Sequence, residues 1–168
     1  MFNDLDGTLW DHKVVSQMKP PFKRIGEGMI IDSIGTTLKI NKTVLDIMRA
    51  IKDEEALLST LSWNNPDVAL HALEELGLRN YSHYHAMEYH PRKDLMAEKA
   101  LTFFKESYNC EEFEIACIDN RDVHLNDLRK KYLETCFIMA WRDFTSISEG
   151  VEKVKNGSRK PFLRFLDA

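Results

Sequence analysis

The segment MFNDLDGTLW (residues 1–10) opens the chain with two aspartates, Asp4 and Asp6, that are separated by one residue and followed by Gly7 and Thr8. Only three residues precede Asp4. We interpret these residues as a very short strand, about 10 Å long, that carries the two carboxylates at its carboxyl end. An Asp-x-Asp pair is also common in simple turns, so its meaning depends on what the rest of the chain places beside it.

The composition indicates a single ordinary globular domain. The chain has 168 residues, of which 43% are hydrophobic and 30% charged, and this length is enough to bury one core. The apolar run at residues 136–141 is too short to span a bilayer. Cys110, Cys117 and Cys136 show no disulfide or zinc spacing, which favours reduced thiols and a cytoplasmic location. The net charge of −4 argues against a nucleic-acid partner, and we expect no membrane partner.

Beyond the opening segment, strands and helices alternate. We expect irregular structure at residues 12–27 and a β-hairpin at 29–40. A helix capped by Asn41 should follow at 41–52. We then expect strands at 56–61, 81–89, 113–118 and 135–140, and helices at 65–76, 92–107, 122–132 and 146–155. This order predicts an α/β fold in three layers, with a doubly wound parallel sheet covered on both faces.

Chemically active residues fall where the predicted strands end, which is where such folds bind ligands. The first strand gives Asp4 and Asp6, and the second gives Ser62. Lys93 follows the third strand. The fourth strand is followed by Asp119 and Asp122. Taken singly, each of these residues also suits a helix cap, a turn or a solvated surface. Their joint occurrence at successive strand ends is what indicates a functional site.

This set of residues suits phosphoryl transfer. A carboxylate can attack phosphorus and form an aspartyl phosphate. Because carboxylates repel a phosphate dianion, a cation must bridge them, and Mg²⁺ accepts one or two carboxylates together with substrate oxygens and water. A lysine and the amides of a helix N-terminus can hold the remaining phosphate oxygens. A second carboxyl group can protonate the leaving oxygen and then activate water.

The segment DLDGTLW (4–10) resembles the first motif of the haloacid dehalogenase (HAD) superfamily of phosphohydrolases. Ser62, Lys93 and IDNRD (118–122) resemble its second, third and fourth motifs. Within the superfamily the chain is most similar to the magnesium-dependent phosphatase family, because of Trp10, KPPFKR (19–24) and the hairpin at 29–40. The resemblance covers roughly residues 2–142.

The resemblance implies a role for each matching residue. Asp4 would be the nucleophile and a metal ligand, and Asp6 the general acid and base whose main-chain carbonyl also binds Mg²⁺. Ser62 and Lys93 would bind phosphate and balance its charge, with Thr8 ordering the loop beside them. Relatives have paired acidic residues where this chain has Asp119 and Asn120. We favour Asp119 over Asp122 as the second carboxylate ligand, with Asn120 and Asp122 in the outer shell.

The superfamily inserts its caps between the first motif and the following helix. Residues 11–41 hold only a loop and a hairpin, which implies a small β-hairpin flap in place of a large cap. We expect a single domain over residues 1–168, whose last residues, 156–168, form a C-terminal tail. The implied activity is Mg²⁺-dependent hydrolysis of a phosphoprotein, such as a phosphotyrosyl protein, or of a small sugar-phosphate-like molecule. The alternatives are a HAD-like acyl or phosphoryl transferase, and a binding or regulatory module that has lost catalysis.

The opening departs from the relatives, which have a longer apolar strand that usually ends in Phe; here Asn3 holds that position and Phe2 is displaced by one residue. Since side chains alternate along a strand, this shift turns Phe2 to the opposite face. Either neighbouring strands hold a shortened strand, or the natural chain begins upstream. We hypothesise that the natural protein has several more apolar residues before Met1. An intact-mass measurement on the native protein would rule this out if the mass matched that of these 168 residues.

Overall fold

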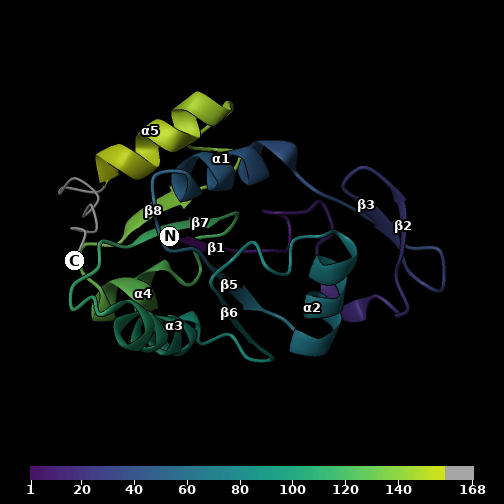
Figure 1. Cartoon of the computed structure of the whole chain (residues 1–168), viewed down its shortest axis with the longest axis horizontal. Coiled ribbons are helices and arrows are strands. Elements are labelled where there is room, and N and C mark those ends of the chain that lie inside the picture. Colours follow the sequence, from purple (N-terminus) through teal and green to yellow (C-terminus); the bar gives the residue numbers. More distant parts are fainter. Residues whose placement is uncertain (158–168) are drawn as a thin grey trace.

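The computed structural model describes residues 1–157, and its centre is a five-stranded parallel sheet (Figure 1). The strand order is β6-β5-β1-β7-β8, and every neighbouring pair is parallel. The strands are β1 (Phe2–Asn3), β5 (Ser59–Trp63), β6 (Tyr84–Glu88), β7 (Ala116–Asp119) and β8 (Cys136–Met139). The predicted doubly wound parallel sheet is therefore confirmed, and the first strand of the chain is its middle strand.

Helices cover both faces of this sheet (Figure 1). On one face lie α1 (Lys42–Lys52) and α5 (Ile147–Gly157), and on the other α3 (Lys93–Tyr108) and α4 (Leu125–Lys131). The helix α2 (Pro66–Glu75) lies beside the small second sheet. Two buried apolar clusters correspond to the two faces. One includes Ile47 and Val154, and the other includes Phe2, Leu61 and Met96.

The two residues of β1 are held by hydrogen-bonded strands on both sides. Phe2 is in register with Ser59 of β5 and Cys117 of β7, and the Asp4 amide donates to the Ile118 carbonyl at 2.9 Å. Phe2 packs in the cluster beneath α3 and α4. Neighbouring strands thus hold the two residues of β1 in place. Because the backbone of β1 leads directly into Asp4, this pairing fixes where the first carboxylate emerges.

A separate three-stranded antiparallel sheet lies at the opposite end of the molecule from the C-terminal helix (Figure 1). It consists of β2 (Lys23–Gly26), β3 (Met29–Ile31) and β4 (Thr37–Lys39), so the hairpin predicted at 29–40 is confirmed. The irregular structure predicted for 12–27 is wrong, because that interval contains β2 and a short 3₁₀ helix, η1 (Val15–Gln17). All four residues of β2 are exposed, which leaves no apolar alternation to recognise in the sequence.

Several predicted boundaries are corrected. The strand predicted at 56–61 begins only at Ser59, where its pairing with Phe2 of β1 starts, and it continues to Trp63. Ser62 therefore lies inside β5. The helix predicted at 122–132 begins at Leu125. The last helix extends to Gly157, so the first two residues of the predicted tail are helical, and its remainder lies outside the described residues.

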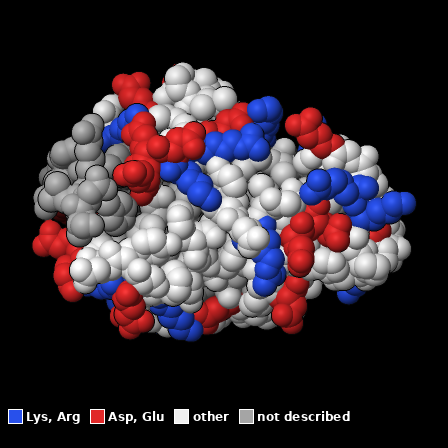
Figure 2. Space-filling model, viewed as in Figure 1, with Lys and Arg blue, Asp and Glu red and all other residues white. Residues whose placement is uncertain are grey.

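The surface carries both signs of charge. On the face drawn in Figure 2, acidic and basic residues intermingle over α1 and over the small sheet. The three cysteines are free thiols, and Cys117 is buried. Within residues 1–157 no helix combines the length and the apolar character needed to cross a membrane.

Candidate active site

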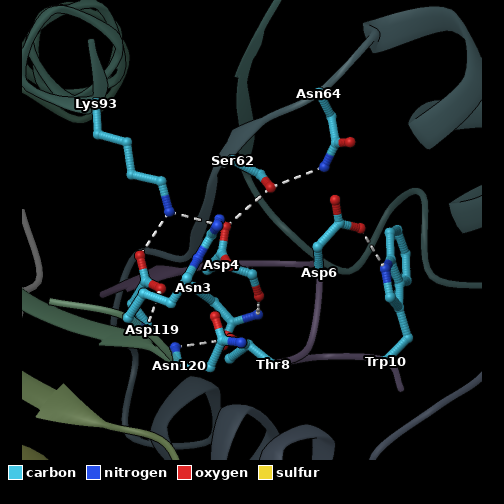
Figure 3. A network of polar contacts seen from close by, with 11 residues as sticks. Asn3, Asp4, Asp6, Thr8, Trp10, Ser62, Asn64, Lys93, Asp119 and Asn120 are labelled. Atoms are coloured by element: carbon cyan, nitrogen blue, oxygen red, sulfur yellow. Dashed lines mark hydrogen bonds and ion pairs between the residues drawn. The ribbon is translucent and has the colours of Figure 1, made fainter. Parts of the chain in front are cut away.

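Four side chains from four separate segments meet at the carboxyl edge of the parallel sheet (Figure 3). Asp4 follows β1, Ser62 lies near the end of β5, Lys93 begins α3, and Asp119 ends β7. Asp4 Oδ1 accepts hydrogen bonds from Ser62 Oγ at 2.9 Å and from Lys93 Nζ at 2.8 Å. Lys93 Nζ also donates to Asp119 Oδ2 at 2.5 Å. The residues predicted from the strand ends are therefore brought together.

This cluster is almost completely buried, since each of its four residues is 1% exposed. Burial alone would lower the pKa of Lys93, but the charges of Asp4 and Asp119 outweigh it and raise the pKa above its ordinary value. Burial, followed by repulsion from Asp4, raises the pKa of Asp119. Lys93 is thus held as a cation by two carboxylates that would otherwise repel each other.

The two carboxylates and one ammonium leave a net negative charge in a dry site. Asp4 Oδ2 is buried and makes no hydrogen bond to any described residue. A buried, unpartnered carboxylate oxygen is costly unless a cation or a donor approaches it. No group of three or more His, Cys, Asp or Glu side chains in residues 1–157 converges on a metal position. An oxygen-only donor set with two carboxylates fits Mg²⁺, which usually takes one or two carboxylates and keeps several waters.

The loop that follows Asp4 is fixed from several directions. Gly7 has a φ of 67°, and a Cβ at this position would lie 2.4 Å from Asn120 Nδ2, so only glycine fits. Thr8 is completely buried, and its hydroxyl oxygen accepts a hydrogen bond from the backbone N–H of Asn120 at 3.0 Å. Trp141, beyond β8, donates its indole N–H to the Gly7 carbonyl at 2.9 Å. The end of the sheet thereby clamps the turn that carries Asp6.

Asp6 lies beside Asp4 but has a separate set of partners (Figure 3). Its Oδ1 accepts from the Trp10 indole at 2.8 Å and from the Val15 amide at 3.2 Å. Burial raises the pKa of Asp6, and the nearby charge of Asp4 adds to the rise, while hydrogen bonds from Trp10, Val15 and Asn64 oppose it. A carboxyl group whose pKa is raised toward neutrality is suited to giving and taking protons.

The two predicted outer-shell residues differ in position. Asn120 contacts the glycine turn, and its Oδ1 is buried without a partner among the described residues. Asp122 is exposed ahead of α4 and lies outside the buried cluster. Asp119 Oδ1 accepts from the Arg121 amide at 2.9 Å, so the backbone after β7 orients this carboxylate. These positions favour Asp119 over Asp122 as a metal ligand.

Several residues of the site were missed by sequence reasoning. Asn64 is completely buried and donates to Ser62 Oγ at 2.9 Å, and its position two residues after Ser62 was the available signal. Trp10 was noted as part of the first motif, but its hydrogen bond to Asp6 was not predicted, and nothing in the sequence marks the hydrogen bond from Trp141 to Gly7. Asn41 holds the N-cap position of α1 as predicted, but its side chain makes no capping bond and instead donates to the Thr8 carbonyl at 2.7 Å.

A parallel α/β sheet with two aspartates, a serine, a lysine and a further aspartate at its carboxyl edge defines a HAD-like phosphatase. Comparison with known families agrees with this class. Residues 1–135 match the family model described as Acid Phosphatase, and the chain belongs to that family. A comparison with curated proteins found no match.

Replacing Lys93 by methionine should strongly destabilise the protein. The variant keeps the length of the side chain but leaves two buried carboxylates without their cation, and removing one partner of a buried ion pair costs about 3–5 kcal/mol. Urea titration at neutral pH in the presence of chelator measures the free energy of unfolding.

The matched control is Lys99→Met, which breaks an exposed ion pair of 2.7 Å with Glu88. Its effect should be far smaller, because water screens surface pairs. Equal effects of the two substitutions would contradict the role assigned to Lys93 in compensating the buried charges.

Proposed function

We propose that the protein is a Mg²⁺-dependent phosphomonoester hydrolase that acts through a covalent aspartyl phosphate on Asp4. One observation carries this proposal. Asp4 is buried with Oδ1 fixed by Ser62 and Lys93, while Oδ2 is left without a partner among the described residues. A nucleophile needs such an arrangement, with one oxygen held in position and the other free to react.

In the first half of the reaction, a carboxylate oxygen of Asp4 attacks phosphorus. The new O–P bond forms as the bond between phosphorus and the leaving oxygen breaks, and Asp6 donates its proton to that oxygen. In the second half, water attacks the same phosphorus as the bond between phosphorus and the Asp4 oxygen breaks, and Asp6 takes the proton from the water. Inorganic phosphate leaves, and both aspartates return to their starting states.

Phosphate binding would depend on Ser62 and Lys93. The Ser62 hydroxyl and the Lys93 ammonium both donate to Asp4 Oδ1 in the structure, so both lie beside the carboxylate that would receive the phosphoryl group. Donors that are already oriented in a dry site stabilise developing negative charge efficiently. Thr8 is buried and bonded to Asn120, which supports the role of ordering the loop.

Magnesium would be held by Asp4, by Asp119 and by the main-chain carbonyl of Asp6. The excess of carboxylate over ammonium charge in the buried cluster supports this ligand set. A bound Mg²⁺ supplies the positive charge that lets a phosphate dianion approach two carboxylates. Lys93 and Ser62 orient Asp4 whether or not the cation is present.

The substrate proposed is a phosphorylated protein, such as a phosphotyrosyl protein, or a small sugar-phosphate-like molecule. The location proposed for the enzyme itself is the cytoplasm. The absence of a large inserted domain between β1 and α1 supports access by either class, because only η1 and the three-stranded sheet occupy that interval. Membership of a phosphatase family implies a phosphorylated substrate, and the kind of substrate is a proposal.

Hydrolysis of an aryl phosphate tests the proposed function directly. We expect turnover with Mg²⁺, loss of turnover with chelator, and loss of turnover in Asp4→Asn, which keeps the shape of the side chain but cannot form the acyl phosphate. Asp53→Asn, at the exposed C-terminal end of α1, is the matched control and should retain full activity. No turnover by well-folded wild-type protein would favour a regulatory module that lacks catalysis.

A second experiment separates the two candidate ligands after β7. Asp119→Asn should raise the Mg²⁺ concentration needed for half-maximal activity by at least about tenfold, since even loss of an outer-shell partner has an effect of this size. Asp122→Asn should leave this concentration almost unchanged, because Asp122 is exposed. Magnesium titration by calorimetry provides a check that does not depend on activity, and the reverse order of effects would reassign the ligand to Asp122.

A further inference from the structure

A chain of hydrogen bonds leads from the start of α2 to the proposed nucleophile. The Asn65 amide donates to Ser16 Oγ at 2.7 Å, and Ser16 Oγ donates to Asn64 Oδ1 at 2.8 Å. Asn64 Nδ2 then donates to Ser62 Oγ at 2.9 Å, and Ser62 Oγ donates to Asp4 Oδ1 at 2.9 Å. Figure 3 shows the last two links, with Ser62 on β5 and Asn64 just beyond the end of that strand.

The two ends of this chain agree on its direction. A backbone N–H can only donate and a carboxylate can only accept, so Ser16 Oγ accepts from Asn65, its proton is directed at Asn64 Oδ1, and Ser62 donates to Asp4. The oxygen of the Asn64 amide is thereby occupied, and its NH₂ group faces Ser62. Ser62 accepts at that side and is left with one proton to donate. That proton points to Asp4.

Asn64 also removes an alternative arrangement of Ser62. The Lys93 ammonium and the Ser62 hydroxyl contact the same oxygen, Asp4 Oδ1. An unrestrained hydroxyl could rotate to accept from Lys93 and turn its proton away from the site. With Asn64 donating to Ser62 Oγ from the opposite direction, this rotation costs a hydrogen bond inside a buried site. Asn64 is itself completely buried, so water cannot replace it.

We propose that Asn64, supported by Ser16, is a positioning residue that keeps Ser62 a hydrogen-bond donor toward the phosphoryl group. This inference rests on the proposed function. A phosphate dianion presents only acceptors, so it needs a donor at this position. The Ser62 proton points to Asp4 Oδ1 in the structure and passes to a phosphoryl oxygen when substrate binds. Asn64 therefore acts on the phosphoryl group through Ser62, and its side chain also lies within hydrogen-bonding reach of Asp6.

The test compares the dissociation constants of inorganic phosphate, measured by calorimetry with Mg²⁺ on the full chain. Asn64→Asp keeps the shape of the side chain but offers only acceptors, so the Ser62 proton turns toward residue 64. We expect phosphate to bind roughly tenfold or more weakly, as in Ser62→Ala, because a hydrogen bond to a charged group is lost. Asn65→Asp is the matched control, since it adds the same charge one residue away while keeping its bond to the Asp67 amide.

The double variant carries the decisive comparison. If Asn64 acts through Ser62, Asn64→Asp should add little further weakening in the Ser62→Ala background, whereas a general effect of charge or folding would persist in full. Ser16→Ala introduces no buried charge, so it serves if Asn64→Asp fails to fold. It should weaken phosphate binding more modestly, and it too should have no effect beside Ser62→Ala.

The outcomes separate this inference from the proposed function. Phosphate binding by wild-type protein, with effects that add in the double variants, would overturn the role of Asn64 and leave the hydrolase proposal intact. Binding that is unchanged in Asn64→Asp would do the same. Wild-type protein that neither binds phosphate nor hydrolyses an aryl phosphate would overturn the proposed function, and this inference with it.

Discussion

The candidate active site depends on one ammonium group, that of Lys93, buried between the carboxylates of Asp4 and Asp119. Two carboxylates do not remain ionised side by side in a dry site without a nearby cation. Lys93 reaches them because it is the first residue of α3, and α3 begins close to the carboxyl end of β6. The connection after β6 therefore has to be short and fixed, since the lysine extends inward from that point. The parallel arrangement of the sheet is what brings the other two partners to the same edge.

The short middle strand shows how little regular structure is needed when the neighbours are complete. Only Phe2 and Asn3 form β1, yet both are paired with β5 on one side and with β7 on the other. The backbone of this short segment is therefore hydrogen-bonded to a neighbouring strand on each side. Asn3 holds the position just before Asp4, and its Nδ2 donates to the Asp4 carbonyl at 2.7 Å. A polar residue thus lies buried in the sheet next to Asp4.

Much of the fold follows from the sequence because helical and strand periodicities alternate clearly after Asn41. The alternation predicts a parallel sheet, and a parallel sheet predicts that Asp4, Ser62, Lys93 and Asp119 meet. The exact start of β5 was harder to predict. The apolar residues at 56–58 continue the strand pattern, and the turn before them at Glu55 depends on a backbone conformation that the sequence does not mark. β2 was missed because all of its residues are exposed. Asn64, Trp10 and Trp141 act through individual side-chain hydrogen bonds, which depend on three-dimensional position and leave no periodic trace.

The short helix η1 connects the segment that precedes the small sheet to both proposed catalytic aspartates. The Val15 amide donates to Asp6, and Ser16 reaches Asp4 through Asn64 and Ser62. These two consecutive residues set a boundary for evolutionary change and for engineering. The exposed turns between β2, β3 and β4 can be lengthened, shortened or exchanged to suit a new substrate, as long as the residues at 15 and 16 and the buried Ile30 and Leu38 keep their places. Grafts that begin after η1 should therefore be tolerated better than grafts that replace it.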